Sequence, residues 1–132
     1  MNRAHVLGDL QLAIMRVLWA EAEATAGQVH EALLDDRGLA PTTIATMLRK
    51  MENKGVVAHR TEGRQFVYRP TVAEHEVHRS MVAELVDRVF EGDAAALAGH
   101  LLTERDFDPA NLARLKALIA AKEQQAEVND AD

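Results

Sequence analysis

The stretch that decides the fold is Pro41–Tyr68, PTTIATMLRKMENKGVVAHRTEGRQFVY. Its first part, residues 41–54, predicts a helix, because proline suits a first helical turn and Gly55 suits the position just past a helix end. Two β-type runs follow at residues 56–60 and 65–69, and a short turn joins them. A helix that leads directly into such a hairpin predicts the core of a winged helix-turn-helix.

The predicted helix 41–54 has two different faces. At 100° per residue, Ile44, Leu48 and Met51 form one apolar stripe. The opposite side has small hydroxyls first and cations later, so it can approach base edges and reach phosphates. That side and its edges carry Thr42, Thr43, Thr46, Arg49, Lys50 and Asn53. An ordinary solvated helix face has the same pattern, and the helix alone leaves that alternative open.

The flanking segments predict the rest of the winged helix. Apolar residues recur at helical spacing over residues 7–20, and a Thr-x-x-Gln capping box at residues 25–28 begins a second helix. A short turn with Gly38 then leads to the helix 41–54. At the hairpin tip, Arg64 can reach a DNA backbone or minor groove, although a merely solvated arginine is the alternative.

Composition and charge limit the classes of function. The 132 residues are 48% hydrophobic and include no Cys, which excludes disulfides and thiol chemistry and agrees with a cytoplasmic location. Neither a secretory signal nor a run of membrane-spanning length is expected. The net charge of −6 argues against nucleic acid, but residues 37–69 hold seven basic and two acidic residues. Such a local patch favours DNA binding.

The sequence predicts two domains, a winged-helix DNA-binding domain at residues 1–70 and a helical dimerisation domain at residues 71–132. The fold class is therefore mostly α with a small β-hairpin. The second domain begins with a long helix whose apolar surface is too wide for one small domain to cover, and a second copy is the simplest partner. The expected dimerisation residues are Val77, Met81, Leu85, Val89, Leu101, Leu115 and Leu118.

No enzyme activity, metal or other cofactor is expected. Glu74, His75 and His78 fall within one helical turn, which would suit a metal shared across a dimer. A complete ligand set needs a further group that the sequence does not supply, so a solvated helix face is the favoured interpretation. Catalytic triads, phosphate loops and metal-binding helices of the usual spacings are all missing, so no catalytic residue is proposed.

Four motifs extend this prediction: LGDLxxxIMxxLW at residues 7–19, VHEAL at 29–33, TTIxTxLxKMxxKGVV at 42–57 and GRxFxYxP at 63–70. Together they resemble the penicillinase and methicillin-resistance repressors of the BlaI/MecI type, with a weaker similarity over residues 71–121. The resemblance implies a homodimeric repressor with a C-terminal dimerisation region, bound to a pseudo-palindromic double-stranded DNA operator. It also implies neighbouring genes for a β-lactamase or a membrane sensor-protease.

The resemblance assigns roles to individual residues. Groove reading falls to Thr42, Thr43 and Thr46, and phosphate or groove contacts to Arg49, Lys50 and Arg64. Family members released by proteolysis are cut at an Asn-Phe bond in the short C-terminal helix, and the aligned pair here, His100-Leu101, departs from that motif. Two alternatives remain, a winged-helix protein–protein adaptor and an effector-responsive winged-helix regulator of another family.

Overall fold

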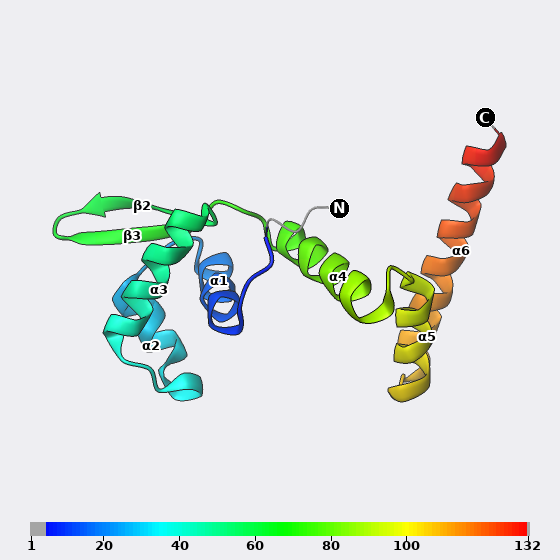
Figure 1. The fold of residues 1–132 in the computed structure, drawn as a ribbon, viewed down its shortest axis with the longest axis horizontal. Coiled ribbons are helices and arrows are strands. Elements are labelled where there is room, and N and C mark those ends of the chain that lie inside the picture. Colours follow the sequence, from blue (N-terminus) through cyan, green and yellow to red (C-terminus); the bar gives the residue numbers. More distant parts are fainter. Residues whose placement is uncertain (1–4, 132) are drawn as a thin grey trace. The chain divides into compact units, whose positions relative to one another are not determined.

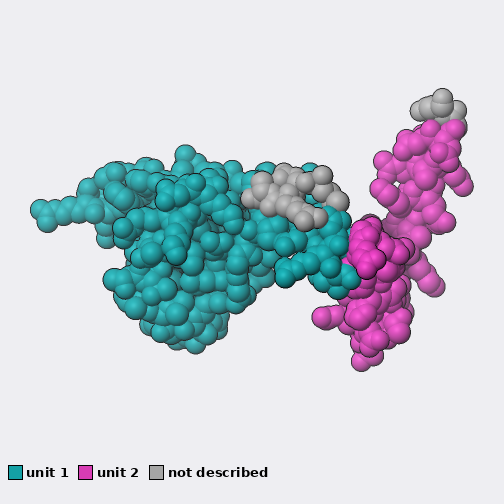
Figure 2. All heavy atoms as spheres, in the orientation of Figure 1, with its two compact units in different colours: residues 1–89 teal, residues 90–132 magenta. Residues whose placement is uncertain are grey.

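The computed structural model describes residues 5–131, which form six helices and three strands. They divide into two compact units, residues 1–89 and 90–132 (Figure 2). The first unit contains α1 (Asp9–Glu21), β1 (Ala24–Thr25), α2 (Ala26–Arg37), α3 (Pro41–Lys54), β2 (Val57–Glu62), β3 (Gln65–Pro70) and nearly all of α4 (Glu74–Phe90). The second contains α5 (Ala94–Glu104) and α6 (Pro109–Ala131).

Local signals in the sequence determine where α2 and α3 begin and end. The predicted capping box is confirmed: Thr25 Oγ1 accepts from the Gln28 amide at 3.1 Å, and Gln28 Oε1 accepts from the Thr25 amide at 2.8 Å. Gly38 ends α2 with φ of 58° and Gly55 ends α3 with φ of 89°, a region that costs a residue with a Cβ. The turn between the two helices is therefore short, as a helix-turn-helix requires.

The wing is part of a three-stranded antiparallel sheet with the order β1-β3-β2. The hairpin of β2 and β3 extends beyond the helices of the first unit (Figure 1). On its inner edge β1 pairs Ala24 with Tyr68 and Thr25 with Val67. The sequence interpretation missed β1, because two residues are too few for side-chain alternation to show.

The hydrophobic core lies between α1, α2, α3 and the sheet. The predicted apolar stripe of α3 is confirmed, since Ile44, Leu48 and Met51 are at most 1% exposed. Fully burying one such side chain contributes about 1.5–3 kcal/mol. The other core side chains that are almost fully inaccessible include Ile14, Met15, Leu18, Val29 and Val56. The core thus fixes α3 with its polar side outward.

The beginning of α4 belongs to the same core. Trp19 Nε1 donates a hydrogen bond to the Val72 carbonyl oxygen at 3.0 Å, and Val77 is fully buried. Val77 therefore packs within its own chain, contrary to the expectation of a dimerisation surface there. Met81, one turn later, is half-buried and packs against the same cluster. The apolar row of α4 is thus divided between the core and the later, exposed turns.

The second unit has well-formed helices but no interior. Asp93 Oδ1 accepts from the Ala96 amide at 3.0 Å and caps α5, and Asp108 Oδ1 accepts from the Asn111 amide at 2.7 Å and caps the start of α6. None of the side chains described in residues 90–130 is buried. The division of the chain at residue 70 into a DNA-binding and a dimerisation domain stays a prediction.

Candidate nucleic-acid interface

One flank of α3 carries four of the six predicted DNA-binding residues. Thr42, Thr43, Thr46 and Lys50 are all exposed, and with Met47 they line a shallow hollow of about 250 Å³. The hydroxyls occupy the first two turns of the helix and the ammonium follows one turn later. The structure therefore brings together small hydrogen-bonding groups and a cation, the combination that base edges and a nearby phosphate require.

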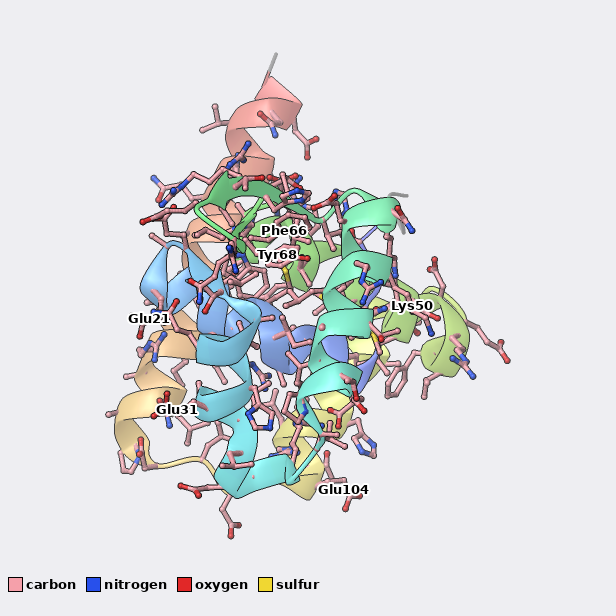
Figure 3. The ribbon with its side chains drawn as sticks, turned by 90° about the vertical axis from the view of Figure 1, so that its left-hand side faces the viewer. Glu21, Glu31, Lys50, Phe66, Tyr68 and Glu104 are labelled. Carbon is pink, nitrogen blue, oxygen red and sulfur yellow. The ribbon has the colours of Figure 1, made fainter. Side chains whose placement is uncertain are left out.

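The other flank of α3 faces a larger hollow, of about 440 Å³, which we call the wing hollow. It lies between the start of α2, the middle of α3 and the tip of the wing, and contains the two remaining predicted residues, Arg49 and Arg64. Its lining is Thr25, Ala26, Gly27, Ala45, Arg49, Arg64, Gln65, Phe66 and Tyr68. Figure 3 shows Phe66 and Tyr68 on one side of α3 and Lys50 on the other.

Three of the basic residues between 37 and 69 are already engaged within the chain. Arg37 Nη1 lies 3.0 Å from Asp9 Oδ2, and Lys54 Nζ donates to the Val6 carbonyl oxygen at 2.7 Å. Arg60 makes two ion pairs, at 2.8 Å with Glu23 and at 2.6 Å with Glu62. These contacts tie separate segments of the winged helix together. Carboxylates neutralise the charges of Arg37 and Arg60, whereas Lys54 is bonded to a neutral carbonyl and keeps its charge.

The other four basic residues are exposed and make no ion pair within residues 5–131; they are Arg49, Lys50, Arg64 and Arg69. Of these, Arg49, Lys50 and Arg64 line the two hollows beside α3, and Arg69 lines neither. The uncompensated positive charge is therefore concentrated around the helix that carries the exposed threonines. This placement suits an anionic partner.

The wing is tied to α3 by a histidine that the sequence interpretation did not select. His59 Nδ1 on β2 lies 2.5 Å from Glu52 Oε1 on α3. The His59 ring stacks on Phe66, with centroids 4.0 Å apart and planes 17° apart. This contact holds Phe66, which is 46% exposed, against the rest of the wing. No sequence signal indicates the pairing, because it depends on the register of the hairpin relative to α3.

Two pKa shifts follow from this arrangement. The hydrogen bond from Arg60 lowers the pKa of the Glu23 carboxyl, so this carboxylate stays charged to more acidic pH than usual. Burial, with a smaller contribution from Glu52, raises the pKa of Tyr68, and the charge of Arg49 opposes that rise. Burial therefore favours the neutral, hydrogen-donating form of the Tyr68 phenol.

Several interface residues were missed by the sequence interpretation. Thr25, Ala26 and Gly27, at the start of α2, line the wing hollow together with Gln65. The capping box had marked that helix start, and helix N-termini attract anions. What the sequence did not show is that this end lies beside the wing. Met47 of α3, which was not among the predicted residues, lines the smaller hollow.

The predicted dimerisation residues beyond Met81 lie on open surfaces. Leu85 is 42% exposed, Val89 59%, Leu101 37% and Leu118 63%, and Leu115 is half-exposed. The predicted cleavage pair, His100 and Leu101, lies within α5, and both side chains are exposed.

The three residues considered for metal binding do not form a site. His75 Nε2 lies 2.8 Å from Arg79 Nη2, and His78 Nε2 lies 4.0 Å from Glu74 Oε2. Within the described residues, no cluster of three or more His, Cys, Asp or Glu side chains has a geometry that could hold a metal ion.

In this winged helix, α3 is the second helix of the helix-turn-helix, and it carries exposed threonines flanked by uncompensated cations. These features define a DNA-binding regulator. The family model described as "Penicillinase repressor" matches residues 7–121, and the chain belongs to that family. It is accordingly a DNA-binding transcriptional repressor and not an enzyme.

Individual relatives agree with this assignment. The transcriptional regulator BlaI of Mycobacterium tuberculosis is 36% identical over 110 residues, which cover 82% of this chain and 80% of the relative. The penicillinase repressor of Bacillus licheniformis is 29% identical over 92 residues, which cover 70% of this chain and 72% of the relative. The solution structure of the DNA-binding domain of the repressor BlaI has a TM-score of 0.50 at 34% identity, and covers 56% of this chain and 90% of that domain.

A likeness in fold extends over most of the chain. A solved hsRosR complex has a TM-score of 0.52 at 19% identity and covers 93% of this chain and 97% of that one. At this identity the comparison concerns the fold alone. Among the helices within residues 5–131, none is both long enough and apolar enough to cross a bilayer.

Proposed function

We propose that the chain acts in the cytoplasm as a homodimer that represses transcription from a pseudo-palindromic operator, each protomer reading one half-site with α3. The observation that carries the proposal is the arrangement around α3. The six exposed residues that the sequence predicts to bind DNA line two hollows on the two flanks of one helix. Such a helix fits the major groove of DNA.

The two kinds of side chain have different tasks in this proposal. Thr42, Thr43 and Thr46 approach base edges and determine the preferred sequence. The cations Arg49, Lys50 and Arg64 contact phosphates, supply most of the affinity and make it depend on salt. Arg64 acts from the wing and the other two act from α3, so phosphate contacts on both flanks would keep the helix in register.

The proposed homodimer is supported by the absence of buried side chains in residues 90–130. Apolar side chains there are exposed without forming a core of their own, and a second copy would cover them. The most exposed are Leu102, Leu118, Ile119 and Val128, at 47–63%. A symmetric dimer would place two α3 helices at half-sites about 34–36 Å apart per turn of DNA.

The regulated genes and the release step are proposed from the relatives. A relative named as a penicillinase repressor favours control of a β-lactamase or another resistance gene. Release would use a membrane sensor-protease that leads to cleavage at the His100–Leu101 bond. Because this bond lies within α5, cleavage requires local unwinding of that helix. Mass spectrometry of the chain from cells exposed to a β-lactam tests this step, and an intact chain during derepression would contradict it.

The central experiment separates the two kinds of contact. Arg64→Ala should weaken binding to all DNA sequences and lower the slope of log affinity against log salt by about 1. Thr46→Val should change the preferred base at one position, by about 1–3 kcal/mol, and leave the salt slope unchanged. Lys122→Ala, which removes one positive charge from α6, is the matched control and should alter neither quantity. If the Arg64 and Thr46 variants behave alike, the assignment is wrong.

A further inference from the structure

The wing hollow has a lining that phosphate contacts alone do not explain. Arg49 and Arg64 would satisfy a phosphate, but most of the lining surface is apolar, and the residues that line it include Ala26, Ala45 and Phe66. A phosphate oxygen gains nothing from such surface. The hollow of about 440 Å³ also falls within the size range of small-molecule sites.

The aromatic part of this lining is held in place before any ligand arrives. One face of the Phe66 ring is stacked on His59, and His59 is itself paired with Glu52 on α3. Phe66 nevertheless remains 46% exposed. Tyr68 meets Phe66 edge to face, with ring centroids 6.4 Å apart. An exposed ring that is fixed by its neighbours offers a flat apolar surface without the entropic cost of ordering it on binding.

The polar part of the lining is strongly selective for anions. Arg49 and Arg64 make no ion pair within residues 5–131, and no acidic residue lines the hollow. A guanidinium binds a carboxylate through two parallel hydrogen bonds and can also stack on an aromatic ring. The neutral phenol of Tyr68 adds a donor on the same side of α3.

We propose that the wing hollow binds a small aromatic carboxylate, with its ring against Phe66 and Ala45 and its carboxylate between Arg49 and Arg64. A ligand there would occupy both arginines that the proposed operator contact needs. It would therefore compete with DNA and act as an inducer. The binding itself does not depend on the proposed function, whereas the competition does.

The test uses 2-naphthoate as the probe and the full-length chain. Titration followed by amide chemical shifts should show saturable binding, with a dissociation constant on the order of 0.1–1 mM for so open a site. The shifts should concentrate at Ala26, Gly27, Ala45 and Phe66. Arg49→Ala and Phe66→Leu should each weaken binding about tenfold, and Arg69→Ala, which removes an exposed arginine outside the hollow, should not.

Two further probes test the chemistry. 2-Naphthalenemethanol, which has the ring without the charge, and inorganic phosphate, which has the charge without the ring, should each bind at least about tenfold more weakly than 2-naphthoate. Equal binding by either probe, or amide shifts spread over other surfaces, would overturn the proposal.

Competition is measured separately with operator DNA. The apparent dissociation constant for operator should rise linearly with the 2-naphthoate concentration, and the Phe66→Leu variant should need about tenfold more 2-naphthoate for the same rise. If operator binds normally but 2-naphthoate neither binds nor competes, this inference fails and the repressor assignment stands. If 2-naphthoate binds as described but operator does not bind, the proposed function fails and the ligand site stands.

Discussion

Residues 5–89 and residues 90–130 are built from the same kinds of helix but stabilised in different ways. In the first unit, side chains from four helices and a sheet meet around Leu48, Met51 and Val77, which are all inaccessible to solvent. In the second, the leucines and Ile119 are exposed or partly exposed, and no described side chain is buried. The winged helix therefore has a core within one chain, whereas residues 90–130 have none of their own. In the proposed dimer, a second copy would cover the exposed apolar side chains of α5 and α6.

The largest expected effect comes from truncating a leucine in each unit. Leu48→Ala should lower the free energy of unfolding by about 2–5 kcal/mol, because it leaves a cavity in a closed core. Leu118→Ala should change the protection of α3 by less than about 0.5 kcal/mol, because its side chain is 63% exposed. Hydrogen exchange of the α3 amides measures both. Equal losses would mean that the two units share one cooperative core.

A charged substitution tests the partner surface directly. Leu118→Glu together with Ile119→Glu should weaken dimerisation at least about 30-fold, since burying a carboxylate in an apolar contact costs about 2 kcal/mol or more. Sedimentation equilibrium gives the dimer dissociation constant. The control is Leu34→Glu, at a similarly exposed leucine on α2 in the first unit. If Leu34→Glu dissociates the dimer and the double variant does not, the dimer contact lies in the first unit and this prediction is wrong.

A smaller effect is expected where the wing is tied to α3. Glu52→Ala removes the partner of His59, so the wing should lose its fixed position beside α3 and operator affinity should fall about threefold to fivefold. Fluorescence anisotropy with labelled operator measures the change. Glu31→Ala, which removes an exposed carboxylate from α2, should leave the affinity unaltered. An unchanged affinity for the Glu52 variant would show that the wing is positioned by the sheet alone.

The smallest effect concerns the pH dependence of the first unit. The pKa of Glu23 is lowered in the folded chain from an ordinary value of 4.5, because Arg60 donates to its carboxylate. The resulting stability is present above about pH 4.5 and is lost as pH falls through the lowered pKa. With Glu23→Gln, the melting temperature should therefore fall less steeply as the pH is lowered from about 5 to about 2. At pH 2 the variant and the unsubstituted chain should have the same melting temperature. If their melting temperatures differ by the same amount at every pH down to 2, the Glu23–Arg60 contact is not the source of the pH dependence.

The sequence was sufficient to predict the winged helix. The six residues expected to bind DNA all line the two hollows beside α3, and their role in DNA binding stays a prediction. Periodicity placed Ile44, Leu48 and Met51 inward, so the polar side of α3 could be identified without coordinates. Contacts between distant segments could not be predicted in this way. Three features depend on tertiary packing: the pairing of His59 with Glu52, the position of the first turn of α2 beside the wing, and the two-residue strand β1.

The burial of Val77 within its own chain could not be predicted for the same reason, because it depends on contacts between distant segments. An i, i+4 apolar row shows that one face of α4 avoids water, but it does not show which surface covers that face. The first turns of α4 pack on their own winged helix, and only the later turns present Leu85 and Val89 outward. Of the predicted dimerisation residues on α4, Val77 is therefore not accessible to a partner, and a dimerisation role for Leu85 and Val89 stays a prediction.

The hydrogen bond between the Trp19 indole and the Val72 carbonyl has a practical consequence. The chain contains one tryptophan, and its ring lies at the junction between α1 and the segment that leads into α4, with the His78 ring 6.4 Å away. Its intrinsic fluorescence should therefore monitor that junction specifically, without an added label. An emission change on addition of operator would then report a change that passes from the wing towards α4.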